Sequence, residues 1–154
     1  MLTYSCELKT LPERPAVAVR TRAAVQDMPK VFQQAFGELM AYLGKVGEQP
    51  AGMPYAAYHN MDMQDLDVEI GFPVSRELDG EGEIRPSKLP GGRWASTMHV
   101  GPYDQLSLAY EALMGWVDKQ GYEAGGAAYE FYLSGPEVPP EQIKTEVAFP
   151  LTST

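Results

Sequence analysis

The sequence has few of the residues that build disulfides and metal sites. Cys6 is the only cysteine among 154 residues, and His59 and His99 are the only histidines. A single cysteine excludes a disulfide within the chain and a zinc site rich in cysteine. The two histidines fall at the ends of different expected strands, and no third ligand is apparent. We therefore expect no metal and no cofactor, and we expect His99 to make a hydrogen bond in a loop.

Long apolar runs and an excess of basic charge are also missing. No apolar stretch approaches the roughly 18 residues that a membrane span needs, and the first residues lack the pattern of a signal peptide. The 21 acidic and 12 basic residues give a net charge of −9. This balance argues against nucleic acid as a partner, because a basic patch would then be expected. These absences predict a cytoplasmic protein with no membrane contact and no direct contact with nucleic acid.

The sequence contains an internal repeat. Three segments of the first half match three segments of the second half in the same order. The matched pairs are AFGELMAYL with AYEALMGWV (35–43 and 109–117), YAAY with YEFY (55–58 and 129–132), and VEIGFPV with TEVAFPL (68–74 and 145–151). The repeat predicts one domain over residues 1–154. Its two halves span about 3–78 and 88–151, and the polar segment 79–92 links them.

Each half has the same expected order of one strand, one helix and two more strands. Apolar residues at helical spacing predict an amphipathic helix from 31 to 46, with Asp27 as its N-cap, and a second helix over about 103–119. Alternating or apolar segments predict strands at 15–20, 54–61, 66–74, 93–100, 127–133 and 145–151. The predicted fold class is α+β, with duplicated strand-helix-strand-strand modules. They would form a pseudo-twofold antiparallel sheet with the two main helices on one face.

The last expected strand of each half carries a glutamate at the same position of the repeat. In VEIGFPV the apolar set is Val68, Ile70 and Phe72, which belongs under a helix. Because strand side chains alternate between faces, Glu69 points to the open face. The matching strand puts Glu146 on the open face as well.

A third glutamate, Glu130, stands at the centre of the expected strand AAYEFYL (127–133). Its neighbours Tyr129 and Phe131 form the more apolar set, so we assign them to the core beneath the helices. The alternation of a strand then places Glu130 and Tyr132 on the open face. A carboxylate in this position has no cation within its own strand to offset the cost of leaving water.

Other large side chains are expected on the same open face. Aligning the strands of the two halves places Trp94, Met98 and Tyr58 there with Glu130 and Tyr132. A solvated sheet face is normally polar, whereas aromatic residues around one carboxylate are typical of a ligand groove. The sequence therefore predicts a ligand groove on this face, lined by these five residues. An alternative stays open, in which the aromatic residues pack among themselves and Glu130 is an ordinary solvated residue.

These motifs together resemble the GyrI-like small-molecule-binding domain, which is also the effector-binding domain of many AraC- and MerR-type regulators. The resemblance covers about residues 3–151 and rests on LPGGRWASTMHVGPYDQL, AYEALMGWVDKQGY, YEFY, TEVAFP and, in the first half, DLDVEIGFPV. It implies a groove along the pseudo-twofold axis. In drug-sensing members a glutamate of the motif that matches YEFY meets cationic aromatic ligands, which implies that role for Glu130. Many relatives carry a helix-turn-helix region, for which the opening residues leave no room here.

Three functions follow from the residues and the resemblance. The leading hypothesis is a stand-alone binding protein for amphipathic, cationic aromatic small molecules. The second is a hydrolase of cyclopropane-bearing alkylating compounds, because some stand-alone relatives resemble such enzymes; the resemblance implies Glu130 and Trp94 as its catalytic pair. The third is a protein partner of DNA gyrase, since some GyrI-like proteins are associated with that enzyme and an acidic surface can compete with DNA for a basic partner.

Overall fold

The computed structural model describes residues 4–134 and 137–152, and the chain divides into two compact units. Unit 1 consists of Met1–Pro12 and Gly91–Thr154, and unit 2 of Glu13–Pro90. In the described part of each unit, one main helix packs on one face of a four-stranded antiparallel sheet. The predicted α+β class is confirmed. That residues 1–154 act as a single domain with a groove stays a prediction.

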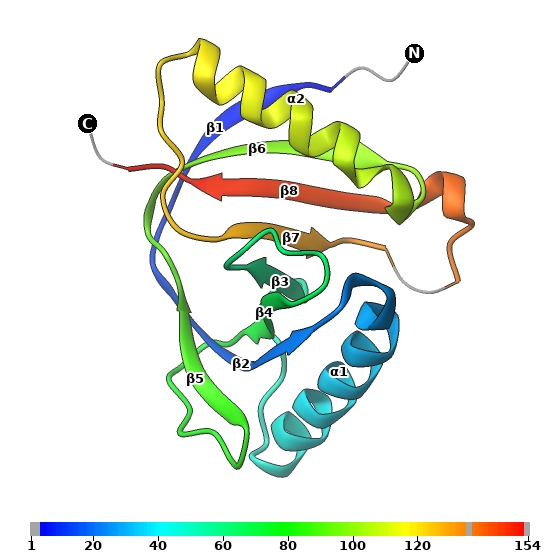
Figure 1. Cartoon of the computed structure of the whole chain (residues 1–154). Helices are drawn as coiled ribbons and strands as arrows, with labels where there is room; N and C mark the ends of the chain where they lie inside the picture. The colour runs from blue at the N-terminus through cyan, green and yellow to red at the C-terminus, as the bar shows by residue number, and fades with distance from the viewer. Residues whose placement is uncertain (1–3, 135–136, 153–154) are drawn as a thin grey trace. The chain divides into compact units, whose positions relative to one another are not determined.

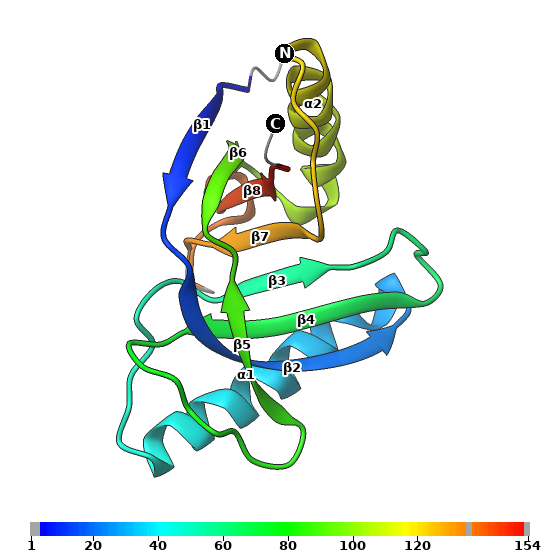
Figure 2. The same ribbon diagram turned by 90° about the vertical axis from the view of Figure 1, so that its left-hand side faces the viewer.

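Unit 2 is built around the first main helix. Its strands lie in the order β3-β4-β2-β5, and α1 covers β2 and β4 (Figures 1 and 2). The ring of Phe36 on α1 meets Phe72 of β4 edge to face at 5.5 Å, which fixes the covered face of β4. The elements are β2 (Arg14–Ala23), a 3-10 turn (Val25–Asp27), α1 (Met28–Lys45), β3 (Tyr55–Tyr58), β4 (Leu66–Pro73) and β5 (Ile84–Leu89).

Unit 1 repeats this arrangement around the second main helix. Its strands lie in the order β1-β6-β8-β7, and α2 runs across β1, β6 and β8 (Figure 1). Beneath α2 lies a core that includes Ala95, Leu113, Val147 and Phe149. The elements are β1 (Cys6–Leu11), β6 (Gly92–Val100), a 3-10 turn (Tyr103–Gln105), α2 (Leu106–Lys119), β7 (Ala128–Tyr132), a 3-10 turn (Pro140–Gln142) and β8 (Lys144–Pro150).

The predicted helices are confirmed, with small differences at their beginnings. Asp27 occupies the N-cap position of α1, as expected, but its side chain makes no capping hydrogen bond. The second helix begins at Leu106, because residues 103–105 form a 3-10 turn. Neither α1 nor α2 nor any other helix of the described residues is long and apolar enough to cross a membrane.

The prediction that segment 79–92 only links the two halves is wrong, because the segment contains the strand β5. Its glycines and Pro86 suggested irregular structure, but a strand at the end of a sheet tolerates a proline, which cannot donate a ladder hydrogen bond. The strand β1 was also not predicted. Both strands pair away from their chain neighbours: β1 precedes β2 but pairs with β6, and β5 precedes β6 but pairs with β2. Each unit therefore receives its fourth strand from the chain segment that leads into the other unit.

Candidate functional site

Glu130 lies on the face of β7 that α2 covers, and the predicted open face is wrong. Its Cα partner across the ladder is Val147, a member of the core beneath α2. Tyr110, on α2, reaches down to its carboxylate. Partners directly across an antiparallel ladder point to the same side, so both observations assign Glu130 to the helix side of unit 1.

The sequence predicts the wrong face for Glu130 because both faces of β7 are buried. Tyr129 and Phe131 were expected beneath the helix, but they pack on the opposite face against Trp94, at ring-centroid distances of 4.9 and 6.2 Å. Tyr129, Glu130 and Phe131 are all buried. The rule that the more apolar set faces the helix holds only where the other face meets water, which is not the case for this strand.

Both oxygens of the Glu130 carboxylate accept a hydrogen bond from a tyrosine. The hydroxyl of Tyr110 donates to Oε2 at 2.5 Å, and the hydroxyl of Tyr132 donates to Oε1 at 2.8 Å. Only 7% of the Glu130 residue surface is exposed. None of the ion pairs within residues 4–134 and 137–152 includes Glu130. The carboxylate is thus held by neutral donors alone.

This environment changes the acidity of Glu130. Burial raises its pKa above the ordinary value, because a charged carboxylate loses its hydration there. The hydrogen bonds from Tyr110 and Tyr132 act in the opposite direction, since they stabilise the charged form, but burial is the larger effect. A positive group brought next to Glu130 would supply the compensation that the two hydroxyls leave incomplete.

Tyr103 extends the cluster from Glu130 towards the surface. It lies in the 3-10 turn before α2, half of it is exposed, and its ring meets that of Tyr132 edge to face at 6.2 Å. Burial raises the pKa of the Tyr103 phenol, and the negative charge of Glu130 raises it further. We call Glu130, Tyr110, Tyr132 and Tyr103 the Glu130 cluster; all four belong to unit 1.

Of the five predicted ligand-binding residues, the structure brings Glu130 and Tyr132 together. Trp94 and Met98 belong to the same unit but lie on the opposite face of its sheet, as their ladder partners Pro150 and Glu146 show. Trp94 is 1% exposed and Met98 40% exposed.

Tyr58 belongs to unit 2, where it pairs with Val68 on the face that α1 covers, and not on the open face. The five residues therefore do not share one open face. The binding roles of all five remain proposals.

Sequence reasoning missed Tyr110 and Tyr103. The spacing of apolar residues in α2 could have indicated the position of Tyr110. Tyr110 lies four residues after the buried Leu106 and three before the buried Leu113. That spacing places it beside the apolar stripe that faces the sheet. Tyr103 precedes the regular helix, and no periodic pattern marks its direction.

The remaining titratable residues of interest lie outside the Glu130 cluster. His99 is fully buried; Tyr4 contacts its Nδ1 at 2.9 Å and the carbonyl of Pro102 its Nε2 at 3.1 Å, which confirms the predicted loop hydrogen bond. Glu69 and Glu146 lie on the faces away from the helices, as predicted. The described residues contain no group of three or more His, Cys, Asp or Glu that could hold a metal ion.

Comparison with solved structures finds the same fold elsewhere. The regulator EcmrR, in a complex with DNA, superposes with a TM-score of 0.85 at 24% identity; the match covers 98% of this chain but only 58% of EcmrR. The EcmrR C-terminal domain alone gives a TM-score of 0.84 at 24% identity, covering 99% of this chain and all of that domain.

More distant structures share the fold as well. A hydrolase from Listeria innocua gives 0.69 at 17% identity, covering 96% of this chain and 91% of the hydrolase. SAV2435, bound to tetraphenylphosphonium, gives 0.71 at 12% identity, covering 96% of this chain and 94% of SAV2435.

Comparison of the sequence itself identifies the family. No curated protein matches this sequence. The model of the GyrI-like small molecule binding domain matches residues 4–152, which is nearly the whole chain. The chain therefore belongs to the GyrI-like small molecule binding domain family.

Proposed function

We propose that this protein binds a lipophilic aromatic cation at the Glu130 cluster. The observation that carries the proposal is a carboxylate that is 7% exposed and contacted by the neutral hydroxyls of Tyr110 and Tyr132. A buried carboxylate without a cation is costly, and a ligand cation removes that cost. Membership of a small-molecule-binding family supports the proposal, as does the tetraphenylphosphonium bound to the structurally similar SAV2435.

The cluster offers two kinds of attraction to such a ligand. The charge of Glu130 contributes on the order of 2–3 kcal/mol for an opposite charge roughly 6–8 Å away, at an effective dielectric constant of about 20. The rings of Tyr103, Tyr110 and Tyr132 contribute about 0.5–2 kcal/mol each where a cation meets a ring face. Tyr103 and Tyr132 both retain partial exposure, so a ligand reaches Glu130 when these two side chains turn aside.

The structure gives the hydrolase alternative no comparable support. That function needed Glu130 and Trp94 in one pocket, with room for a water between the carboxylate and the substrate. Trp94 is buried against Tyr129 and lies on the other face of the sheet of unit 1 from Glu130. We therefore propose binding and not hydrolysis.

We also propose that the protein acts in the cytoplasm and that its partner is a small molecule. A net charge of −9 favours a cationic ligand through long-range attraction and disfavours direct contact with nucleic acid.

Two ions of the same shape and opposite charge test the proposal. We expect tetraphenylphosphonium to bind with saturation in isothermal titration calorimetry. We also expect it to raise the melting temperature, because it contacts Glu130 in the folded protein and not in the unfolded chain. Tetraphenylborate presents the same four phenyl rings with a negative charge, and we expect no saturable binding. Equal affinities for the two ions, or no binding of the phosphonium, would overturn the proposal.

A further inference from the structure

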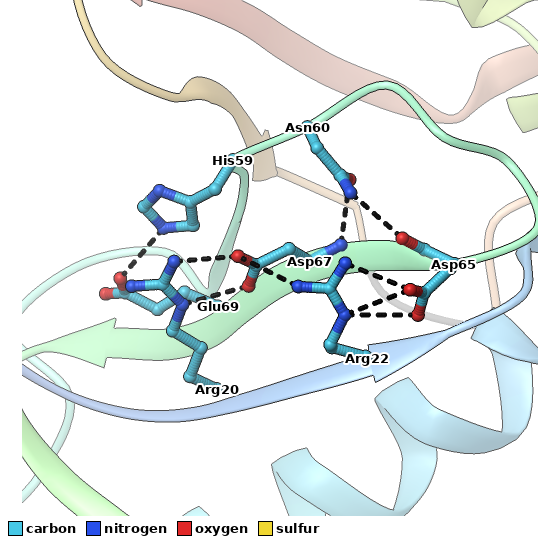
Figure 3. A network of polar contacts seen from close by, with 7 residues as sticks. All are labelled: Arg20, Arg22, His59, Asn60, Asp65, Asp67 and Glu69. Atoms are coloured by element: carbon cyan, nitrogen blue, oxygen red, sulfur yellow. Dashed lines mark hydrogen bonds and ion pairs between the residues drawn. The ribbon is translucent and has the colours of Figure 1, made fainter.

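A second carboxylate, Glu69 of unit 2, is also largely removed from water. Only 12% of its side chain is exposed. Its Oε2 accepts hydrogen bonds from the hydroxyl of Tyr55 at 2.7 Å and the hydroxyl of Ser87 at 2.6 Å. Its Oε1 faces Nε2 of His59 at 3.5 Å (Figure 3). The neutral hydroxyls of Tyr55 and Ser87 therefore orient Oε2 of Glu69, whereas Oε1 faces the more distant imidazole of His59.

The arginines beside Glu69 are engaged elsewhere. Arg20 is the Cα partner of Glu69 across the ladder of β2 and β4, but its guanidinium makes a two-pronged contact with Asp67, at 2.9 and 2.8 Å. Arg22 binds Asp65 (Figure 3). The hydrogen bonds to Asp67 raise the pKa of Arg20, and the negative charge of Glu69 raises it by a smaller amount. Neither arginine forms an ion pair with Glu69 within residues 4–134 and 137–152.

The repeat supplies an internal comparison for this site. Glu146 on β8 occupies in unit 1 the position that Glu69 holds on β4 of unit 2, four residues before the proline that ends the strand. Oε2 of Glu146 binds the ammonium of Lys9 at 2.5 Å. Lys9 lies on β1, in a strand pairing that corresponds to that of β5 with β2.

The ladder registers identify the residue that replaces Lys9 in unit 2. Lys9 pairs with Trp94, which in turn pairs with Pro150. Ser87 pairs with Ala16, which in turn pairs with Pro73. Ser87 thus stands where unit 1 has its lysine. The two units present the same glutamate, but unit 2 lacks the built-in ammonium group.

We propose that Glu69 is a binding site for a small primary ammonium ion, whose NH₃⁺ group takes the place at Glu69 that the Lys9 ammonium takes at Glu146. Tyr55 and Ser87 hold the carboxylate in position, and the imidazole of His59, whose Nε2 lies 3.5 Å from Oε1, is the intramolecular competitor. This site shares no residue with the Glu130 cluster, because every residue that forms it belongs to unit 2.

The test uses n-butylammonium as the probe and 1-butanol as its neutral analogue. Protein labelled with ¹³C at the glutamate carboxyl carbons is titrated with each compound and followed by NMR. We expect n-butylammonium to shift the Glu69 carboxyl signal with saturation and 1-butanol to leave it unchanged. Glu69→Gln identifies the Glu69 signal, which is missing from the spectrum of that variant. Ser87→Lys should weaken binding at least about tenfold, because it supplies the missing ammonium.

Two further variants separate this proposal from the proposed function. Glu130→Gln should leave n-butylammonium binding at Glu69 intact, and Lys9→Ser should create a second ammonium site, seen as a saturable shift of the Glu146 signal. Thermal melting checks that each variant is folded. No saturable shift of the Glu69 signal in the wild type, or a shift that Ser87→Lys leaves unchanged in folded protein, would overturn the proposal whatever happens at Glu130.

Discussion

Glu130→Gln is expected to weaken tetraphenylphosphonium binding by roughly 10- to 100-fold. The substitution keeps the size of the side chain but removes the negative charge. Its amide oxygen accepts a hydrogen bond from one of the hydroxyls of Tyr110 and Tyr132, and its NH₂ group donates to the other. Coulomb's law gives about 2–3 kcal/mol for two opposite charges roughly 6–8 Å apart at an effective dielectric constant of about 20. Each 1.4 kcal/mol is about a factor of ten in the dissociation constant. Calorimetric titration of the two proteins under the same conditions measures the difference.

A matched control separates the local charge from the overall charge. Glu111→Gln removes one negative charge from the exposed side of α2, next in sequence to Tyr110 but outside the Glu130 cluster. Its effect on the dissociation constant should stay within about twofold, since exposed charges are screened by salt. Similar losses of affinity in Glu111→Gln and Glu130→Gln would show that long-range attraction, and not contact at Glu130, governs binding.

Gly71→Ala is expected to cause a large loss of stability. A Cβ at this position of β4 would lie 2.5 Å from the carbonyl oxygen of Val17, 2.9 Å from Cβ of Ala18 and 3.0 Å from the hydroxyl of Tyr55. The first of these atoms belongs to the backbone of β2 and cannot turn away. Overpacking of this kind costs about 1–3 kcal/mol. Chemical denaturation of the variant measures the change in unfolding free energy.

Gly37→Ala is the matched control and should change stability in the opposite direction. Gly37 is exposed on α1, and an added Cβ there meets no atom within 4 Å. Alanine in a helix interior is more favourable than glycine by about 0.5–1 kcal/mol. An unfolding free energy for Gly71→Ala equal to that of the wild type would mean that β2 and β4 do not approach each other as closely as described.

The sequence was sufficient to predict the two modules because their signals are local and repeated. The helix spacing in 31–46 and the matched segments VEIGFPV and TEVAFPL depend on neighbours within a few residues, and the structure confirms both helices and both strands. The edge strands β1 and β5 were missed for the opposite reason. Their partners β6 and β2 are distant in the sequence, and Pro86 with the surrounding glycines resembles a loop.

The candidate site could be predicted only in part. Glu130 was identified because a carboxylate in the middle of an apolar strand is unusual, and its hydrogen bond to Tyr132 links two of the predicted residues. Its face was assigned wrongly, since alternation along one strand cannot tell which face is covered when both are buried. Tyr110 reaches Glu130 from another element, and a contact of that kind requires the packing of α2 on the sheet.

The acidity of the Glu130 carboxyl, with and without ligand, tests the central claim most directly. Burial raises its pKa in the folded protein. Relative to Glu130→Gln, stability from this group is therefore fully present below the pKa of the unfolded chain and is lost as the pH rises through the folded pKa. A cation bound at Glu130 stabilises the charged form, so it should lower the pKa again.

The measurement is a pH titration of the Glu130 carboxyl carbon by ¹³C NMR, in the free protein and with saturating tetraphenylphosphonium. The account predicts a pKa above the value of about 4.3 for an ordinary glutamate in the free protein, and a lower pKa once the phosphonium is bound. An ordinary pKa in the free protein, or a raised pKa that the bound phosphonium leaves unchanged, would contradict the account.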